Sequence, residues 1–443
     1  MPVNRNAEIH EVLRSHPALR AVLLTDFLVL LAELGALVIL PWWITSSGGA
    51  GALVVFGVTL AVATFIAMPA VSPFGDRLCK GRQITWGLGC LCLVAATQAG
   101  LSFAGVFSLA ALMALAVVQV LAASFVNPAR DAVLTELMPH AQLPVAIRLR
   151  KTTQAVSGIL GPLLAGAAIA SVGVSGALCL HGGLLAAAML AASRIPRLTG
   201  GVPQGRGFAV WWRDLRAGLA AKWLVPMERG WTLVNFAVWI FQGPAVGLLI
   251  PIKVHALGLQ GNWLGLCLGA LSLGVLLGSV FGSRRLGDHF GRYRVRIGLG
   301  FTEGIALAAV GLTASPSLML VGLAIAGFCN ASLGLVGATH RALAIPREYR
   351  VRMFAAGAMT TQVAGAIGPA LVGMALARYS VSAVYAAWGL LMATCVLGFL
   401  VVPRLKEFLT LGHHEVADWY RLQYPAVFAS RDAEAQRPRS GVG

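Results

Sequence analysis

The chain has 443 residues, of which 58% are hydrophobic and only 12% are charged, and its mean hydropathy is +0.78. These proportions exclude a soluble domain whose main solvent is water. The net charge of +17 could indicate a nucleic-acid-binding protein, but the positions of the basic residues, given below, argue against one.

Apolar runs recur along almost the whole chain, and each is long enough, at about 20 residues, to cross about 30 Å of hydrocarbon. They lie at 19–44, 53–72, 84–104, 107–130, 144–170, 174–193, 230–252, 263–283, 296–314, 317–340, 352–377 and 381–403. Residues 1–18 are mixed and polar, and we expect no removable signal peptide there. The sequence therefore predicts an all-α membrane protein with twelve transmembrane helices.

Lys and Arg are distributed unevenly around these spans. If the N-terminus lies in the cytoplasm, all but two of the 34 basic residues fall in cytoplasmic tails, cytoplasmic loops or the inner ends of helices. The exceptions are Lys253 and Arg378. Because this distribution follows the positive-inside rule, we expect a multi-pass protein of the bacterial inner membrane with both termini in the cytoplasm. We expect anionic membrane lipids, and no nucleic acid, as the partners of its basic residues.

The longest polar stretch between spans, residues 194–229, divides the chain into two similar parts. We expect a cytoplasmic N-terminal tail at 1–18, a six-helix bundle at 19–193, a cytoplasmic linker at 194–229, a second six-helix bundle at 230–403 and a cytoplasmic C-terminal tail at 404–443. Such repeated halves are typical of membrane transporters.

Within the linker, bulky apolar residues recur at helical spacing beside basic ones. They are Trp211, Trp212, Leu215, Leu219 and Trp223. This pattern predicts an amphipathic helix that lies on the inner leaflet of the membrane. A simple tether between the two bundles is the alternative.

Two stretches of the first half recur in the second half. Residues 152–166 match 360–373 through a Thr-Thr-Gln sequence that is followed by spaced glycines and a Gly-Pro pair. The Gly-Pro pairs are Gly161-Pro162 and Gly368-Pro369. Residues 75–82 match 287–292 through Gly-Asp followed by Gly-Arg. Close helix packing explains the glycines, and we expect the Gly-Pro pairs to mark bends at which the helices rock.

The loop that begins at Ser72 and contains Asp76-Arg77 and Gly81-Arg82 resembles the inner-loop signature of the major facilitator superfamily. The stretch 158–166 resembles the Gly-Pro signature of that family's antiporters, and 127–139 resembles the same region of its drug and siderophore exporters. Ser72 replaces the usual first glycine, and two extra residues separate the two halves of the loop signature. This spacing is also seen in the exporter and lysophospholipid-carrier branches. The resemblance covers essentially the whole chain and implies two pseudo-symmetric six-helix bundles that transport by alternating access.

The loop signature supplies the candidate gating residues. They are Asp76, Arg77 and Arg82, with Asp288 and Arg292 at the matching place in the second half, and Asp131. A carboxylate there can face a helix N-terminus of the other half, and Arg77 can pair with an acid such as Asp131. Contacts that exist in only one conformation would bias the equilibrium by about 1–3 kcal/mol. A solvated basic loop that only fixes the topology is the alternative.

Three acids inside the spans are functional candidates, because an unpaired charge is costly to bury. Asp26 and Glu33 lie on one face of the first span, two helical turns apart. We expect Glu33 to couple transport to protons, since it lies deep in the span at a position that is often acidic in the exporters that the chain resembles. Asp26 is the second candidate and could instead pair with Arg20. Glu303 is the weakest, since the ninth span of this family packs outside the helices that line the cavity.

Polar side chains of the fourth, seventh and tenth spans are expected to line a substrate cavity, together with Trp239 and Phe241. They are Gln119, Arg130, Asn235, Gln242, Asn330 and Arg341. Aromatic rings beside amides suit a bulky amphipathic ligand. Structural ion pairs at the cytoplasmic mouth and hydrogen bonds between helices would account for the same residues.

The sequence predicts no enzyme, no cofactor and no metal site. None of the five lysines follows a glycine, as a phosphate-binding loop would require, and no nucleophile lies beside a base deep in the spans. The tail contains His413, His414, Glu415 and Asp418, which we interpret as solvated residues rather than metal ligands.

The leading hypothesis is a monomeric, proton-coupled exporter of a small amphipathic molecule, such as a drug or a siderophore. Its partners would be that small-molecule substrate, protons and membrane lipids. One alternative is a carrier of a lysophospholipid or another lipid-like substrate without proton coupling. The other is a membrane receptor or scaffold that keeps the fold but does not transport.

Overall fold

The computed structural model of the protein describes residues 12–75, 79–139, 142–196, 208–412, 415–416 and 418–428, which contain helices and no strand. The first half comprises α2 (Pro17–Gly75), α3 (Lys80–Phe103), α4 (Leu109–Leu137) and α5 (Leu143–Ala192). The linker contains α6 (Phe208–Leu224). The second half comprises α7 (Pro226–Gly247), α8 (Leu249–Ala256), α9 (Gly261–Leu277), η1 (Gly278–Gly282), α10 (Ser283–Phe290), α11 (Arg292–Leu312), α12 (Pro316–Leu335), α13 (Ala338–Ala344), α14 (Arg347–Leu376), α15 (Val381–Leu397) and η2 (Gly398–Val401).

Two helices of the first half each contain two membrane spans. α2 has 59 residues and α5 has 50 residues, more than twice the length that one crossing needs. Each is broken at a glycine with positive φ, Gly49 (φ 77°) in α2 and Gly173 (φ 71°) in α5. Glycine adopts this conformation without the steric penalty that a side chain would bring. Each helix therefore consists of two arms that join at its glycine.

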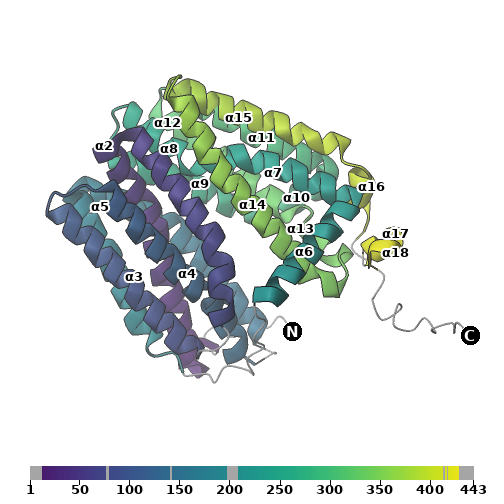
Figure 1. Ribbon diagram of the computed structural model, residues 1–443, viewed down its shortest axis with the longest axis horizontal. Helices are drawn as coiled ribbons and strands as arrows, with labels where there is room; N and C mark the ends of the chain where they lie inside the picture. The colour runs from purple at the N-terminus through teal and green to yellow at the C-terminus, as the bar shows by residue number, and fades with distance from the viewer. Residues whose placement is uncertain are drawn as a thin grey trace, which may run out of the picture.

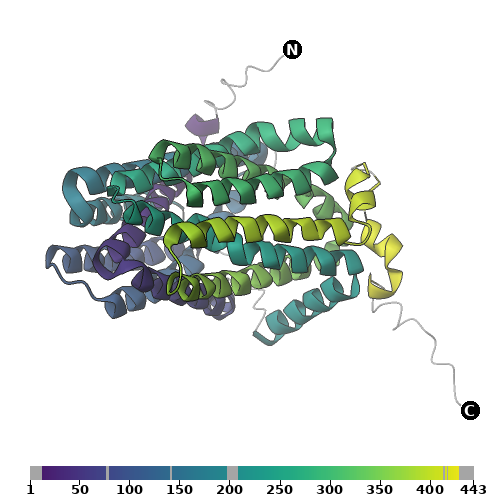
Figure 2. The ribbon, with the colours of Figure 1, turned by 90° about the horizontal axis from the view of Figure 1, so that it is seen from above.

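The predicted number of crossings is confirmed. Among the described residues, nine helices are long and apolar enough to cross a membrane, and α7 and α8 form one further span with a 41° bend. Counting both arms of α2 and of α5 brings the total to twelve spans. Figures 1 and 2 show the two halves side by side, with the first half in purple and blue and the second in teal to yellow.

The two halves touch near the helix ends that lie opposite the basic loops. Gly166 of α5 meets Gly265 of α9 so closely that a Cβ atom on Gly265 would lie 2.6 Å from the Pro162 carbonyl oxygen. On the other side of the interface, a Cβ atom on Gly373 of α14 would lie 2.6 Å from the side chain of Val54 of α2. The absence of side chains at these glycines is what lets the helix backbones approach one another.

The predicted bend residues lie at such helix crossings. Gly161 faces the Leu31 carbonyl of α2, and Gly368 faces the Ile240 carbonyl of α7. α5 and α14 continue through Pro162 and Pro369 without a break. The bending role of the two Gly-Pro pairs stays a prediction, and their packing role is visible in these contacts.

Lys253, one of the two exceptions to the predicted charge distribution, is buried. Its ammonium group donates hydrogen bonds to the Gly311 carbonyl (2.8 Å) and to the Ser382 hydroxyl (2.7 Å). A lysine that lies inside the protein in this way is not part of a solvated loop. It therefore carries no information about topology.

A helix is present where the linker pattern predicts one, although the linker residues 197–207 lie outside the described part. Leu215 of α6 is buried against Ala356 and Met359 of α14, while Trp212 and Trp223 are largely exposed. An exposed aromatic face beside basic residues fits a helix at a membrane surface. That placement remains a prediction.

The C-terminal tail departs from the expectation of solvated residues. Residues up to 428 form α16 (Leu405–Thr410), α17 (Trp419–Gln423) and α18 (Pro425–Phe428), and their aromatic rings pack together. Phe408, Tyr420 and Phe428 are at most 2% exposed, so the described part of the tail is a folded cap on the second half. His413 and His414 lie outside the described residues.

Candidate functional site

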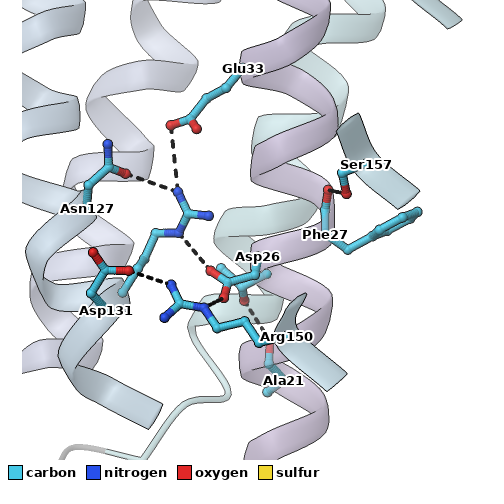
Figure 3. A network of polar contacts seen from close by, with 10 residues as sticks. Ala21, Asp26, Phe27, Glu33, Asn127, Asp131, Arg150 and Ser157 are labelled. Carbon is cyan, nitrogen blue, oxygen red and sulfur yellow. Dashed lines mark hydrogen bonds and ion pairs between the residues drawn. The ribbon is translucent and has the colours of Figure 1, made fainter. Parts of the chain in front are cut away.

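A network of charged side chains connects three helices of the first half (Figure 3). Asp26 of α2 accepts hydrogen bonds from Arg130 Nε of α4 (2.8 Å) and from Arg150 Nε of α5 (2.6 Å). Arg150 Nη2 also binds Asp131 of α4 (2.8 Å). Arg130 Nη1 donates to the Asn127 side chain (3.1 Å). Asp26 thereby joins the first, fourth and fifth spans at the ends that lie nearest the basic loops.

The carboxylate of Asp26 is 1% exposed, and both of its oxygens are bound to arginines. These contacts replace the alternative pairing with Arg20. Removing one partner from a buried ion pair costs about 3–5 kcal/mol, because the other charge is left uncompensated. Asp26 is thus held as a structural anion in this conformation.

Glu33 lies two turns deeper on α2 and has a different environment. Its side chain is 30% exposed, and its nearest cation is Arg130, with Oε1 and Nη1 3.7 Å apart. It lines a cavity of about 280 Å³ whose wall is mainly Leu, Val, Ala and Phe, with Gln119, Asn127 and His181 as its other polar members. Of the two acids of the first span, Glu33 is the one that faces open space.

The second half contains a matching cluster around Glu228 of α7, which is completely buried. Arg341 of α13 binds both carboxylate oxygens (2.7 and 2.9 Å), Lys222 of α6 binds one (2.9 Å), and the Tyr420 hydroxyl donates to the other (2.6 Å). As in the first half, an acid near the start of the bundle meets an arginine from the region of its fourth span. Glu228 therefore ties the linker, α13 and the C-terminal cap to α7.

Burial lowers the pKa of the Lys222 ammonium group, and the Glu228 carboxylate opposes this effect. Burial, together with the charge of Glu228, raises the pKa of the Tyr420 phenol well above its usual range. The hydroxyl of Tyr420 consequently keeps the proton that it donates to Glu228.

Two adjoining cavities in the second half are lined by the side chains that the sequence singles out. The first, of about 260 Å³, is lined by Asn235, Trp239 and Arg341 among others. The second, of about 160 Å³, is lined by Gln242 and Asn330. Gln119 lines the cavity of the first half, and Arg130 lies in the ion network beside that cavity. Phe241 instead packs edge-on against Trp388, with ring centroids 5.8 Å apart.

The expectation that the ninth span lies away from the cavities is wrong for Glu303 of α11. Glu303 lines the 160 Å³ cavity, where its Oε1 accepts hydrogen bonds from Gln242 (2.5 Å) and Asn330 (3.2 Å). Its other oxygen is buried and receives no hydrogen bond from the described part of the chain. The family resemblance missed this position because the facing amides come from α7 and α12, far away in the sequence.

The candidate gating residues are only partly described. Asp76 and Arg77 lie outside the described residues, Arg82 is exposed on α3, and Asp288 is exposed on α10. Asp131 is bound to Arg150, as given above. Arg292 donates to the Leu411 carbonyl (3.2 Å) and lies 3.2 Å from His340 Nε2, so it connects the second-half loop to the C-terminal cap. The gating role itself stays a prediction.

Sequence reasoning missed four residues of these clusters. They are Arg150, Glu228, Arg296 and Tyr420. Arg150 and Arg296 counted only toward the topology, Tyr420 fell in the predicted tail, and Glu228, at the end of the predicted linker, was not singled out. The internal repeat could have predicted Glu228. Because the two halves are similar, Asp26 near the start of the first half suggests an acid near the start of the second half. Within the described part of the chain, no three His, Cys, Asp or Glu side chains are arranged to hold a metal ion.

The fold resembles several solved structures at low sequence identity. Against the peptide transporter POT in complex with alafosfalin, the TM-score is 0.69 at 13% identity, covering 89% of this chain and 96% of that one. Against the nucleoside transporter NupG, it is 0.71 at 10% identity, covering 87% and 98%. Against a bacterial homolog of the human lysosomal transporter Spinster, in an inward-facing and unoccupied conformation, it is 0.58 at 16% identity, covering 90% and 96%.

Among curated protein sequences, none is significantly similar to the chain. The sequence profile of the Major Facilitator Superfamily, however, matches residues 22–284 and again 231–418. These two matches overlap at 231–284 and together cover most of the chain. The three solved structures named above are all of transporters. The chain therefore belongs to the Major Facilitator Superfamily and has the fold of its multi-pass membrane transporters.

Proposed function

We propose that the protein is a proton-coupled secondary transporter that exports a small amphipathic molecule by alternating access. The observation that carries the proposal is the position of Glu33, an acid on the wall of a mainly apolar cavity, beside an arginine that another carboxylate already holds. Asp26 stays bound to Arg130 and Arg150. Glu33 is then the group of this network that exchanges the proton.

The coupling follows from the cost of burying charge. Ionised Glu33 is tolerable while water reaches the cavity, but closure of the cavity around it would leave a carboxylate only weakly compensated by Arg130 at 3.7 Å. Protonation of Glu33 removes that cost and leaves Arg130 bound to Asp26 alone. A proton taken up on one side thus permits the closure that carries it to the other side.

The proposed direction and location are supported by the sequence. The 158–166 stretch resembles the antiporter signature, and the basic residues favour cytoplasmic termini in an inner membrane. The size of the substrate is supported by the cavities, which range from about 160 to 280 Å³ and combine an apolar wall in the first half with amides and indoles in the second half.

The test is proton movement in proteoliposomes that contain a trapped pH dye. A panel of aromatic amphiphiles is added under an imposed pH gradient, and substrate-driven proton flux is recorded. We expect flux in the native protein, none in Glu33→Gln, and partial flux in Glu33→Asp. Glu136→Gln is the matched control, because Glu136 is exposed on α4. Native proton flux in the Glu33→Gln protein would refute the coupling.

A second candidate is a lipid-like substrate that moves without proton coupling. The apolar wall of the first-half cavity favours it, since alkyl chains need no polar partner. Efflux of a fluorescent lysophospholipid that a protonophore leaves unchanged would support this candidate. Efflux that the protonophore abolishes would support coupling to protons.

A further inference from the structure

Arg296 of α11 holds a positive charge on the wall of both second-half cavities without an ion pair among its described contacts. Its Nη1 donates to the Leu333 carbonyl (3.0 Å), and its Nη2 donates to the Asn235 side chain (2.9 Å). Its Nε is buried and has no hydrogen-bond partner among the residues that the structure describes. Both of its bound acceptors are neutral, so they satisfy donors without neutralising the charge.

The guanidinium group of Arg296 is also fixed in place by aromatic rings. It lies 4.5 Å from the ring centroid of Trp231 and 4.7 Å from that of Phe399. A side chain held in this way loses little conformational freedom when it binds a ligand. Arg296 is therefore preorganised for binding.

The charges around the larger cavity do not balance. Lys222, Arg296 and Arg341 all line it, and Glu228 binds the first and the last of them. Even if Glu303 of the adjoining cavity is ionised, three cations face two carboxylates. Arg341 lies 5.1 Å from the ring centroid of Trp231, so two guanidinium groups contact the same indole. An anion in this space would relieve the repulsion between them.

Aromatic and aliphatic side chains complete the wall. Trp231, Phe236, Trp239 and Phe354 line the same cavity. An acidic group beside the arginines would thus place its attached hydrocarbon or ring against indole and phenyl surfaces.

From this arrangement we infer that the second-half cavity binds the acidic group of an organic anion, a carboxylate or a phosphate monoester that carries a flat or apolar substituent. The inference rests on the proposed transport function, because it assigns a substrate class to that transporter. Arg296 is the principal ligand of the anion, and Trp231 and Trp239 contact its substituent.

Equilibrium binding to the full-length protein in phosphatidylcholine nanodiscs tests the inference. Indole-3-acetate, indole-3-acetamide and tryptamine share one ring and carry a negative, a neutral and a positive group, so calorimetry with this trio isolates charge. We expect indole-3-acetate to bind at least about tenfold more tightly than the amide, and tryptamine to bind most weakly. Equal affinities for the three compounds in the native protein would overturn the inference without any variant.

Variants then locate the charge that is responsible. Arg296→Gln should abolish the preference for the acid, and Arg296→Lys should keep part of it. Arg294→Gln is the matched control, because Arg294 is an exposed arginine on the same helix, and it should bind like the native protein. A preference that survives in folded Arg296→Gln protein, checked by size-exclusion chromatography, would also overturn the inference.

The acidic group could come from a free metabolite or from a lipid headgroup, and the nanodisc composition separates the two. If phosphatidylglycerol competes for the site, it weakens indole-3-acetate binding to the native protein but not to Arg296→Gln. If only small anions enter, the lipid has no effect. Both outcomes support an anion site and differ in its source. Because this assay uses no gradient, it reports anion binding whether or not Glu33 couples transport to protons. A failure of proton coupling in the proteoliposome assay is therefore distinguishable from a failure of anion binding here.

Discussion

Replacing Glu228 with glutamine keeps the shape of the side chain but removes the one carboxylate that, within the described part of the chain, binds Lys222 and Arg341. Glu228 is 0% exposed, and the side chains of Lys222 and Arg341 are only 5% and 14% exposed, so water compensates little of the charge that the substitution leaves. Breaking a buried ion pair on one side costs about 3–5 kcal/mol. For a cooperative unit of about 150–250 residues, that cost lowers the melting temperature by roughly 6–20 °C.

The assay is thermal unfolding of the purified protein in detergent, followed by tryptophan fluorescence. Tyr420→Phe removes one neutral hydrogen-bond donor and leaves both cations paired with Glu228. It should therefore lower the free energy of unfolding by only about 1–2 kcal/mol. Asp131→Asn is the control in the first half, where the acid side chain is 74% exposed, and it should change stability by no more than about 0.5 kcal/mol.

A double variant separates charge from shape. Adding Lys222→Met to Glu228→Gln removes one of the two uncompensated cations, so it should recover part of the lost stability, since an apolar group replaces a buried charge at little cost. A Glu228→Gln protein that melts with the native protein would refute the reasoning. So would a double variant that melts below Glu228→Gln.

Three further outcomes can be measured. Gly265→Val should abolish transport in proteoliposomes while the protein still inserts, because its Cβ would lie 2.6 Å from the Pro162 carbonyl and hold the halves apart; normal transport would contradict this packing. Lys253→Met should change the melting temperature by only a few degrees, since it removes a buried charge together with its two hydrogen bonds; a loss as large as that of Glu228→Gln would contradict it. Hydrogen bonding from Arg404 lowers the pKa of Glu407, so this pair should be intact at neutral pH and lost only as the pH falls through that lowered value. A carboxyl chemical-shift titration, compared with Arg404→Gln, checks the sign, and an unchanged titration in the variant would disprove the coupling.

Hydropathy and the distribution of basic residues were sufficient to predict the spans, because crossing a bilayer imposes length and composition on each segment separately. The breaks at Gly49 and Gly173 fall in the short loops that separate the predicted spans, 45–52 and 171–173. They do so because a chain can turn back only where a span ends. Both properties are local, so they can be read without knowing how the helices pack.

The candidate site was less predictable, because its contacts depend on which helix faces join. Glu33 and the amides of the second half could be singled out as polar residues in apolar segments. Nothing local to Glu228 indicates that Tyr420, 192 residues later, will reach its carboxylate. The role of Arg150 could not be predicted for the same reason. The sequence shows Arg150 only as a basic residue that fixes the topology, and the packing of α5 on α2 makes it the second partner of Asp26.

The cluster around Glu228 also sets an order in time for the growing chain. The ion network of the first half is complete once Arg150 has been synthesised, and α5, which ends at Ala192, completes that bundle. The first bundle can therefore settle while the second half is still on the ribosome. The second half must wait for Tyr420, close to the end of the chain, before the last donor reaches its buried carboxylate. A nascent chain that stops before α17 would carry a finished first bundle and an incompletely stabilised second one.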